Sequence, residues 1–390
     1  MEKKAYALNY RSQQKLNRGT IFLITHDEHM SIDLTTIRKQ SIASLVEQAR
    51  SHGIDNAGNM RKSDLIFALI CAATSKGKTI RGDGVLEILG EGFGFLRSPV
   101  SDYGPGTDDI YVSPAQIRRF NLRSGDFIEG KARTPQKEGE RYLALLQIES
   151  VNGQSPEESR NRNLFETFSL AEKSPLRFSH EVIQTWAAQK NILKGDRVLI
   201  RYTNGASCVR ALLPFLQHHE VTIVYLSIET PSEDILVLEN VGINTFVSPM
   251  GEGAARHLQV ANLALMRAKR LAEEGEDVVL VFDSLWSYIL CAQEQIEHQG
   301  KQNSFSTACS MFRFFWGAAR QLQKGSLSIY ALLPTAFSSE IARVESQILH
   351  QTHHELFLSL ELEKEKCMPP LLVQAPQGDP VLMWKEYLSR

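Results

Sequence analysis

Residues 82–97 read GDGVLEILGEGFGFLR, and their pattern decides the fold of the first half of the chain. Two short apolar runs are separated by glycines, and Phe93 and Phe95 stand two residues apart, which places both rings on one face of a strand. Further short apolar runs, bounded by Gly, Pro, Asp and Asn, occur at residues 110–112, 127–128 and 143–148. Short strands punctuated in this way predict a small closed β-barrel over residues 81–152.

Aromatic and charged residues alternate along these predicted strands. The residues concerned are Phe93, Phe95, Arg97, Asp109, Tyr111, Glu140 and Tyr142. An open face of rings beside carboxylates and a guanidinium suits single-stranded nucleic acid, because bases stack on the rings and polar groups read the exposed base edges. The alternative is that the rings form the barrel core, and alternation does not by itself separate the two hypotheses. We favour the exposed face, because two phenylalanines flanked by glycines at 92 and 94 would be an unusual way to build a core.

The chain before the barrel predicts a helical head. Apolar residues from Asp33 to Arg50 recur with a period of about 3.6, which indicates one amphipathic helix. Ser63 or Asp64 is suited to cap a second helix. We therefore expect a helical head over residues 31–80, preceded by a polar extension over residues 1–30.

The second half of the chain alternates between strand-like and helix-like segments. A polar, helix-poor stretch predicts a linker over residues 153–175. Within residues 176–390, strands are predicted at Arg197–Tyr202, Val221–Ile228, Asp277–Asp283 and Ser326–Leu333. Helices are predicted at Cys208–His218, Ala254–Glu274 and Thr307–Leu322. This alternation favours a mostly parallel α/β sheet, so the whole chain is expected to be an α+β multidomain protein.

Composition excludes several classes of protein. The 390 residues are 43% hydrophobic and 23% charged, which argues against a disordered or fibrous chain, and no run of 18 apolar residues predicts a membrane span. The polar N-terminus predicts no signal peptide, and five cysteines without a C-x-x-C pair predict neither a disulfide framework nor a zinc site. Residues 1–162 carry a net charge of +3 and the remainder −5, which permits a nucleic-acid partner without requiring one. We expect a reduced, cytoplasmic protein that binds no membrane and no metal.

Several motifs of the first half together resemble the family of bacterial transcription termination factor Rho. They are residues 60–62 (MRK), 82–89, the GFGFLR run, and residues 108–114, 116–123 and 139–142. The resemblance implies an OB-like or cold-shock-like domain that captures unstructured, cytosine-rich RNA. It assigns the primary RNA site to Leu89, Phe93, Phe95, Arg97, Asp109, Tyr111, Glu140 and Tyr142. Beside them, in a basic segment, we expect phosphate contacts from Arg118, Arg119 and Arg123.

The second half resembles the family's RecA-like ATPase domain, with matches at residues 256–261, 268–271, 283–284 and 317–320. That chemistry needs a glycine-rich phosphate loop followed by Lys and Thr. Here Gly205 and Ser207 lie in the corresponding loop, but Cys208 replaces the Lys and Val209 replaces the Thr. The loop therefore lacks the cation for the β- and γ-phosphates and the hydroxyl for Mg²⁺.

Other departures agree with a degenerate phosphate loop. Glu229 corresponds to the family's catalytic Glu and Asp283 to its Walker-B Asp, and we interpret both as inherited remnants. The positions of the family's next Arg, channel Lys, adenine-stacking Phe and arginine finger fall at or near Thr230, Glu340, Met368 and Ala375. We expect ATP hydrolysis to be lost, with ATP and Mg²⁺ bound only if the degenerate site still accepts them.

The sequence thus predicts a Rho-like protein that binds single-stranded RNA and acts in transcription termination or its regulation. Two alternatives stay open: an active ATP-dependent RNA helicase with an atypical phosphate loop, and a non-catalytic partner or antagonist of Rho. The partners expected beside RNA are RNA polymerase or Rho subunits, in a homo- or hetero-oligomer.

Overall fold

The computed structural model describes residues 32–74, 79–136, 139–178, 181–202, 209, 212, 220–239, 243–335, 338–359, 362 and 371–372. The chain divides into two compact units. The first comprises residues up to Gly82 with 106–110 and 130–147, and the second comprises 83–105, 111–129 and everything from Ile148 onward. Within the described residues no helix is both long and apolar enough to cross a bilayer.

The helical head belongs to the first unit and contains α1 (Leu34–Arg38), α2 (Ile42–Ser51) and α3 (Lys62–Ala73). The prediction of a single helix from Asp33 to Arg50 is wrong, because the helix is interrupted after α1. Ser41 is extended there, and its hydroxyl accepts a hydrogen bond from the backbone of Ser44 to begin α2. The predicted cap of α3 is also wrong: the capping residue is Arg61, and the Asp64 carboxylate accepts a hydrogen bond of 2.9 Å from the Thr107 hydroxyl instead.

The first sheet confirms the predicted barrel. Its strands run in the order β1-β2-β3-β4-β6-β5, and an additional pairing of β2 with β5 closes it. The bounds are β1 Ile32–Asp33, β2 Ile80–Ile88, β3 Gly94–Arg97, β4 Ile110–Val112, β5 Phe127–Arg133 and β6 Leu143–Val151. Helix α4 (Pro114–Phe120) follows β4 and begins with a reciprocal capping box between Ser113 and Gln116.

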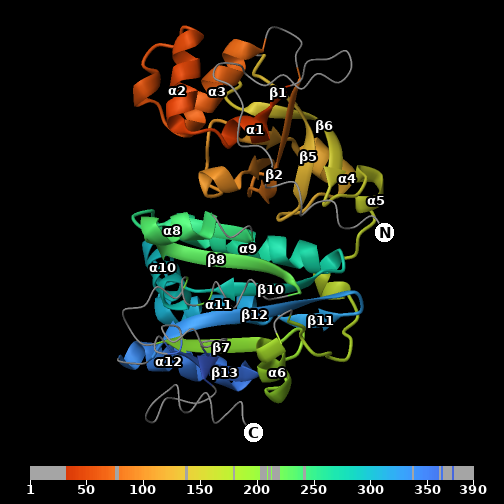
Figure 1. Ribbon diagram of the computed structural model, residues 1–390, viewed down its shortest axis with the longest axis vertical. Coiled ribbons are helices and arrows are strands. Elements are labelled where there is room, and N and C mark those ends of the chain that lie inside the picture. The colour runs from red at the N-terminus through yellow and green to blue at the C-terminus, as the bar shows by residue number, and fades with distance from the viewer. Residues whose placement is uncertain are drawn as a thin grey trace. The chain divides into compact units, whose positions relative to one another are not determined.

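The second sheet confirms the predicted mostly parallel α/β sheet. Its order is β14-β13-β7-β12-β10-β8-β9, and all neighbours from β13 to β9 are parallel (Figure 1). The strand bounds are β7 Arg197–Tyr202, β8 Thr222–Thr230, β9 Asn244–Pro249, β10 Asp277–Phe282, β11 Arg320–Leu322, β12 Gly325–Pro334, β13 His354–Leu358 and β14 Leu371–Leu372. The helices are α5 Pro156–Ser159, α6 Glu181–Gln189, α8 Ser232–Glu239, α9 Ala254–Glu273, α10 Leu285–His298, α11 Ser304–Trp316 and α12 Ser339–Ile348.

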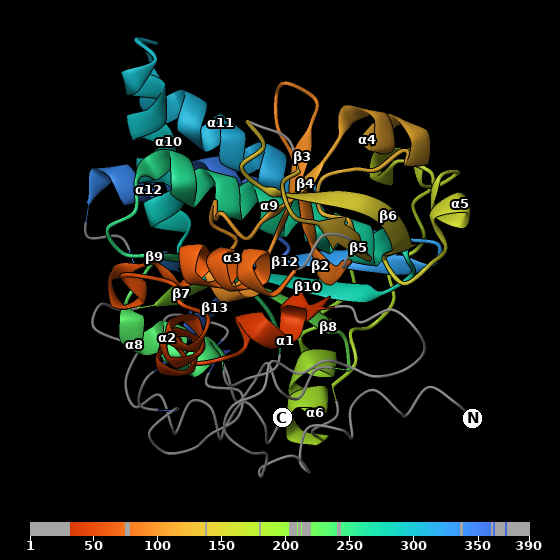
Figure 2. The same cartoon turned by 90° about the horizontal axis from the view of Figure 1, so that it is seen from above.

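Strand periodicity builds two cores on this sheet. In β10, Val278, Leu280 and Phe282 face one core, while Val279 and Val281 face the other. Helices α9, α10, α11 and α12 cover the first face and α6 and α8 the second (Figure 2). Strands buried on both faces explain the unbroken apolar runs seen in the sequence.

One predicted helix of this domain is too long. The helix expected over Thr307–Leu322 ends at Trp316, and Arg320–Leu322 forms β11, which pairs antiparallel with β12. Gly317 ends the helix, and the ladder with β12 then supplies the backbone partners that another helical turn would have given.

Residues 153–175, expected as a linker, pack within the second unit. Phe165 is fully buried, with the Lys269 ammonium 5.3 Å and the Arg320 guanidinium 5.0 Å from its ring centre. The segment also contains the single-turn helix α5, which a second capping box between Ser155 and Glu158 starts.

Gly125 lies directly against the backbone of α9 within the second unit. Its φ is +88°, and a Cβ there would lie 2.5 Å from the carbonyl oxygen of Met266 and 2.6 Å from the nitrogen of Arg267. Both atoms belong to the backbone of α9, so neither can move out of the way cheaply.

We therefore expect Gly125→Ala to lower the free energy of unfolding by about 2–5 kcal/mol, the sum of left-handed strain and overpacking. Gly153→Ala is the matched control, because Gly153 also has a positive φ (+77°) but open space around it. It should cost only the strain of about 1–2 kcal/mol. Urea titrations of both variants measure the difference, and equal losses would contradict the steric argument.

Candidate RNA interface and nucleotide end

Three rings of the second unit form a compact aromatic triad, consisting of Phe93, Phe95 and Tyr111. Their centres lie 5.8 Å (Phe93–Phe95), 5.6 Å (Phe93–Tyr111) and 5.9 Å (Phe95–Tyr111) apart. Phe95 in β3 is only 8% exposed, whereas Phe93 and Tyr111 are half-buried. The expectation of two solvent-facing phenylalanines is therefore wrong for Phe95, which supports the rings that are more open.

The turn between β2 and β3 holds Phe93 in place. The Leu89 backbone nitrogen donates to the Phe93 carbonyl oxygen at 2.8 Å, and the Gly92 nitrogen donates to the Leu89 carbonyl oxygen at 2.9 Å. Gly92 has a φ of +86°, a conformation that glycine adopts without strain. Leu89 itself is half-buried beside this turn.

Arg97 is held rigidly beside the triad. Its guanidinium lies 5.0 Å from the centre of the Phe95 ring, and its Nε is 2.7 Å from the Glu87 carboxylate. The Glu87 carboxylate also accepts a hydrogen bond of 2.6 Å from the Gln259 side chain on α9. Glu87 and Gln259 were not predicted, because nothing local in the sequence marks a pair 172 residues apart.

The other predicted RNA-site residues, Asp109, Glu140 and Tyr142, belong to the first unit. Asp109 is fully buried and accepts a hydrogen bond from the Gly106 nitrogen at 2.8 Å. The Glu140 carboxylate accepts hydrogen bonds from both terminal nitrogens of Arg133, at 2.6 and 2.8 Å. The Tyr142 side chain is 40% exposed. Each carboxylate is thus oriented by protein donors.

The three predicted phosphate-binding arginines differ in their surroundings. Arg118 and Arg119 are exposed in the last turn of α4. The Arg119 guanidinium lies 5.1 Å from the Phe120 ring centre. Arg119 also lines a cavity of about 310 Å³, together with Phe120, Glu157, Arg160 and Asn161. Arg123, by contrast, is half-buried and pairs with Glu273 at 3.2 Å. Its guanidinium is therefore already engaged.

The carboxyl end of the parallel sheet, where the sequence predicts a degenerate nucleotide site, is described in part. Gly205, Ser207, Cys208, Met368 and Ala375 lie outside the described residues. Val209 is buried at 3% exposure, and the Thr230 hydroxyl donates to the Ser227 hydroxyl at 2.7 Å. Glu340 is exposed in the first turn of α12.

Glu229 and Asp283, the two acidic residues predicted at this end, also differ in their surroundings. Glu229 is exposed and has a φ of +55°, at an irregularity in the pairing of β8 with β9. Asp283, directly after β10, is buried and accepts a hydrogen bond of 3.0 Å from the Tyr225 hydroxyl. Burial raises the pKa of the Asp283 carboxyl to about 6, although the neighbouring Ser227, Ser284 and Tyr225 hydroxyls partly oppose the shift.

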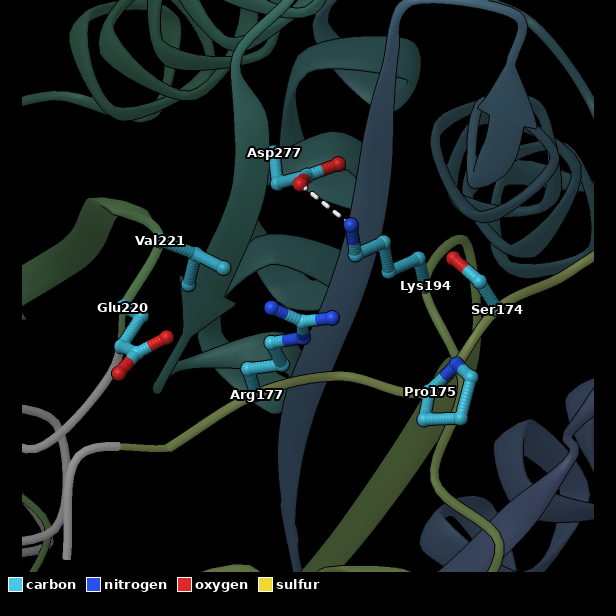
Figure 3. A pocket seen from close by; sticks show the side chains of 7 residues that line it. All are labelled: Ser174, Pro175, Arg177, Lys194, Glu220, Val221 and Asp277. Carbon is cyan, nitrogen blue, oxygen red and sulfur yellow. Dashed lines mark ion pairs between the residues drawn. The ribbon is translucent and has the colours of Figure 1, made fainter.

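A separate cavity of about 470 Å³ lies near the amino ends of β7 and β10 (Figure 3). Lys194 and Asp277 pair across it at 2.6 Å, and the Arg177 guanidinium points into the same space. Open α/β sheets bind their ligands at the carboxyl ends of the strands. This cavity therefore lies outside the predicted nucleotide site.

Comparison with known proteins supports the predicted resemblance. The family model described as Rho termination factor, RNA-binding domain, matches residues 82–157, and the one described as Rho termination factor, N-terminal domain, matches residues 36–78. The chain is 36% identical over 365 residues to transcription termination factor Rho of Chromobacterium violaceum, covering 87% of this chain and 85% of that protein. It is 35% identical over 359 residues to transcription termination factor Rho of Escherichia coli (strain K12), with the same coverage. Among solved structures, an ATP synthase subunit, NeqB, aligns over 57% of this chain and 61% of its own, at 18% identity and a TM-score of 0.45.

The buried Asp283 gives a test of the nucleotide end. Because burial raises the pKa of this carboxyl from the ordinary 3.8 to about 6, the folded protein loses relative stability as the pH rises through this window. We expect Asp283→Asn to raise the free energy of unfolding at pH 7 by on the order of 1–3 kcal/mol. The gain should vanish near pH 3.

Urea titrations across this pH range measure the effect. Asp277→Asn is the control at the other end of β10, where the carboxylate pairs with Lys194 and its loss should not stabilise the protein. An Asp283→Asn protein that is less stable than the parent at pH 7 would contradict the desolvation argument.

Proposed function

Since the chain belongs to the Rho transcription termination factor family, we propose that it binds single-stranded, cytosine-rich RNA and acts in transcription termination or its regulation without hydrolysing ATP. The observation that supports the proposal most directly is the aromatic triad, together with Arg97, which pairs with Glu87 beside it. Phe93 and Tyr111 offer ring surface for base stacking, and the buried Phe95 ring packs against both.

Charged side chains in each of the two units suit the recognition of base edges and phosphates. Arg97 is held by Glu87, so its donors require little reordering when RNA arrives. We assign base-edge contacts to Asp109 and Glu140, following the family's primary site, and stacking to Tyr142. Leu89 would contact the base that enters beside Phe93.

Phosphate contacts are proposed for Arg118 and Arg119, whose side chains are exposed on α4. Arg123 is a weaker candidate than it was on sequence alone, because its guanidinium already pairs with Glu273. On this proposal residues 81–152 recognise RNA, and residues 176–390 form a RecA-like domain that has lost its chemistry.

The residues present do not fit Mg²⁺-ATP. The sequence lacks the phosphate-loop Lys and Thr, and buried, apolar Val209 stands where a metal-binding hydroxyl is needed. The raised pKa of Asp283 also reduces the carboxylate's readiness to hold a cation at a pH below about 6. No Arg lies between Arg343 and Arg390 to serve as the finger. Phosphoryl transfer depends on positioned charge, and these losses remove most of it.

We further propose that the chain works in the cytoplasm, where bacterial nascent RNA is made, as a homo-oligomer or as an inactive subunit among Rho subunits. RNA polymerase is a possible partner by the same family argument. The alternative of a non-catalytic antagonist differs only in outcome: such a protein would occupy RNA or Rho without supporting termination.

The stacking proposal predicts that Phe93→Ala weakens binding of a short cytosine oligomer by ~1–3 kcal/mol, because one base-stacking platform is lost. Phe314→Ala is the control: Phe314 is 73% exposed on α11 and should not change the affinity. Phe95→Ala should weaken binding and lower stability as well, since Phe95 is buried. Fluorescence anisotropy measures the affinities. Equal affinity of the Phe93→Ala and parent proteins would exclude Phe93 as a platform.

The loss of catalysis predicts no ATP hydrolysis above background, even with polycytidylate present. A highly purified preparation and a coupled phosphate-release assay test this. The double variant Cys208→Lys, Val209→Thr restores the two missing groups and shows whether they suffice. RNA-stimulated turnover by the parent chain that Glu229→Gln abolishes would establish the active-helicase alternative.

A further inference from the structure

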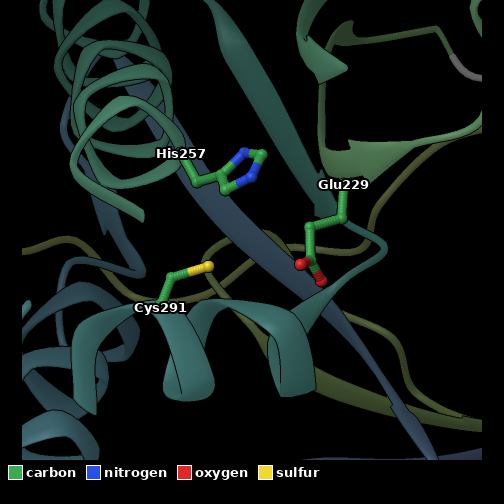
Figure 4. A group of neighbouring side chains, drawn as sticks. All are labelled: Glu229, His257 and Cys291. Atoms are coloured by element: carbon green, nitrogen blue, oxygen red, sulfur yellow. The ribbon is translucent and has the colours of Figure 1, made fainter. Parts of the chain in front are cut away.

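Three side chains that the proposed RNA-binding function does not use converge at the carboxyl end of the parallel sheet. They are Glu229 at the end of β8, His257 in α9 and Cys291 in α10 (Figure 4). One potential ligand atom from each lies within 4.8 Å of the other two. Figure 4 shows all three side chains directed toward a shared space.

The imidazole is oriented for coordination. His257 is only 2% exposed, and its Nδ1 lies 2.8 Å from the Ser248 hydroxyl oxygen. A hydrogen bond at Nδ1 fixes the ring and leaves Nε2 as the coordinating nitrogen, which is the usual arrangement of a histidine that binds a metal.

The carboxylate is placed by an unusual backbone. Glu229 has a φ of +55°, between Ile228 and Thr230, where the register of β8 against β9 shifts. A non-glycine residue in this conformation costs of order 1–3 kcal/mol, and such residues gather at functional sites. Glu229 is exposed, whereas its neighbours Ile228 and Thr230 are buried.

The thiol completes a mixed donor set. Cys291 is 5% exposed, and its neighbours include the Glu229 and Glu294 carboxylates. A divalent cation would compensate the negative charge and convert the thiol to a thiolate ligand, releasing its proton.

We propose that Glu229, His257 and Cys291 together bind a divalent cation of the Zn²⁺ class. One sulfur, one imidazole nitrogen and one carboxylate oxygen suit a borderline-soft ion, whereas Mg²⁺ and Ca²⁺ prefer oxygen ligands alone. Three protein ligands leave a fourth position, on the exposed side of Glu229, for water. The ion would join the end of β8 to α9 and α10, and it does not depend on the RNA-binding proposal.

This site departs from the expectation of no metal, which rested on the lack of a C-x-x-C pair. The three ligands come from three separate elements across 63 residues of sequence. Sequence spacing carries no signal for such a set, because only the packing of α9 and α10 beside β8 brings the atoms together.

Co²⁺ titration of the full-length protein, freed of metal by a chelator, tests the site. We expect saturable binding with a thiolate-to-Co²⁺ charge-transfer band in the near ultraviolet, and displacement of Co²⁺ by Zn²⁺. Cys291→Ser should abolish the band. The matched control is Cys309→Ser, which removes an equally buried thiol on α11 that belongs to no such cluster among the described residues.

Two further variants keep the test decisive if Cys291→Ser fails to fold. Glu229→Gln alters an exposed side chain and should weaken Co²⁺ binding at least tenfold. Ser248→Ala removes the partner of His257 and should weaken it by about 10- to 100-fold while retaining the band. No charge-transfer band in the parent protein, a band unchanged by Cys291→Ser, or one lost equally in Cys309→Ser would overturn the proposal.

Discussion

The close contact of Gly125 with the backbone of α9 is the constraint on which the second unit depends. A side chain at this position would displace the helix, and the helix is the wall of the larger core. A partly buried polar network centred on Asp126 lies beside the contact. Arg267 on α9 donates to the Asn152 side chain at 2.7 Å, and Asn152 donates to Asp126 at 2.9 Å. Arg162 closes the network with two hydrogen bonds to Asp126, at 2.6 and 2.8 Å.

The charge state of Asp126 is set by that network. Burial alone would raise the pKa of its carboxyl, but the hydrogen bonds from Arg162, Arg123 and Asn152 outweigh burial and hold it below the ordinary value. A carboxyl with a lowered pKa stabilises the folded state at neutral pH and loses that contribution on acidification. Removing Arg162 would leave a buried charge uncompensated, which typically costs about 3–5 kcal/mol.

Helix α9 contributes residues both beside the aromatic triad and to the proposed cation site. In its first turns, Arg256 donates to the Tyr103 carbonyl oxygen at 2.8 Å, and Gln259 donates to Glu87 beside the aromatic triad. Between them in sequence, His257 faces the Glu229 and Cys291 cluster. The support of Arg97 by Glu87 and Gln259 and the proposed cation site therefore share one helix.

The sequence by itself determined the features that depend on residues close together in the chain. The two-residue spacing of Phe93 and Phe95, the glycine-bounded strands and the alternation of strands with helices predicted the barrel, the ring cluster and the parallel sheet, because these periodicities follow from local backbone geometry. Only the tertiary structure decided that Phe95 is covered, that Glu87 and Gln259 engage Arg97, that Glu273 engages Arg123, and that the helix after Ser304 ends at Trp316. It alone placed Glu229, His257 and Cys291 together. Each of these depends on contacts between residues far apart in the chain, and no local pattern of residues specifies which distant partner will fill the space beside a given side chain.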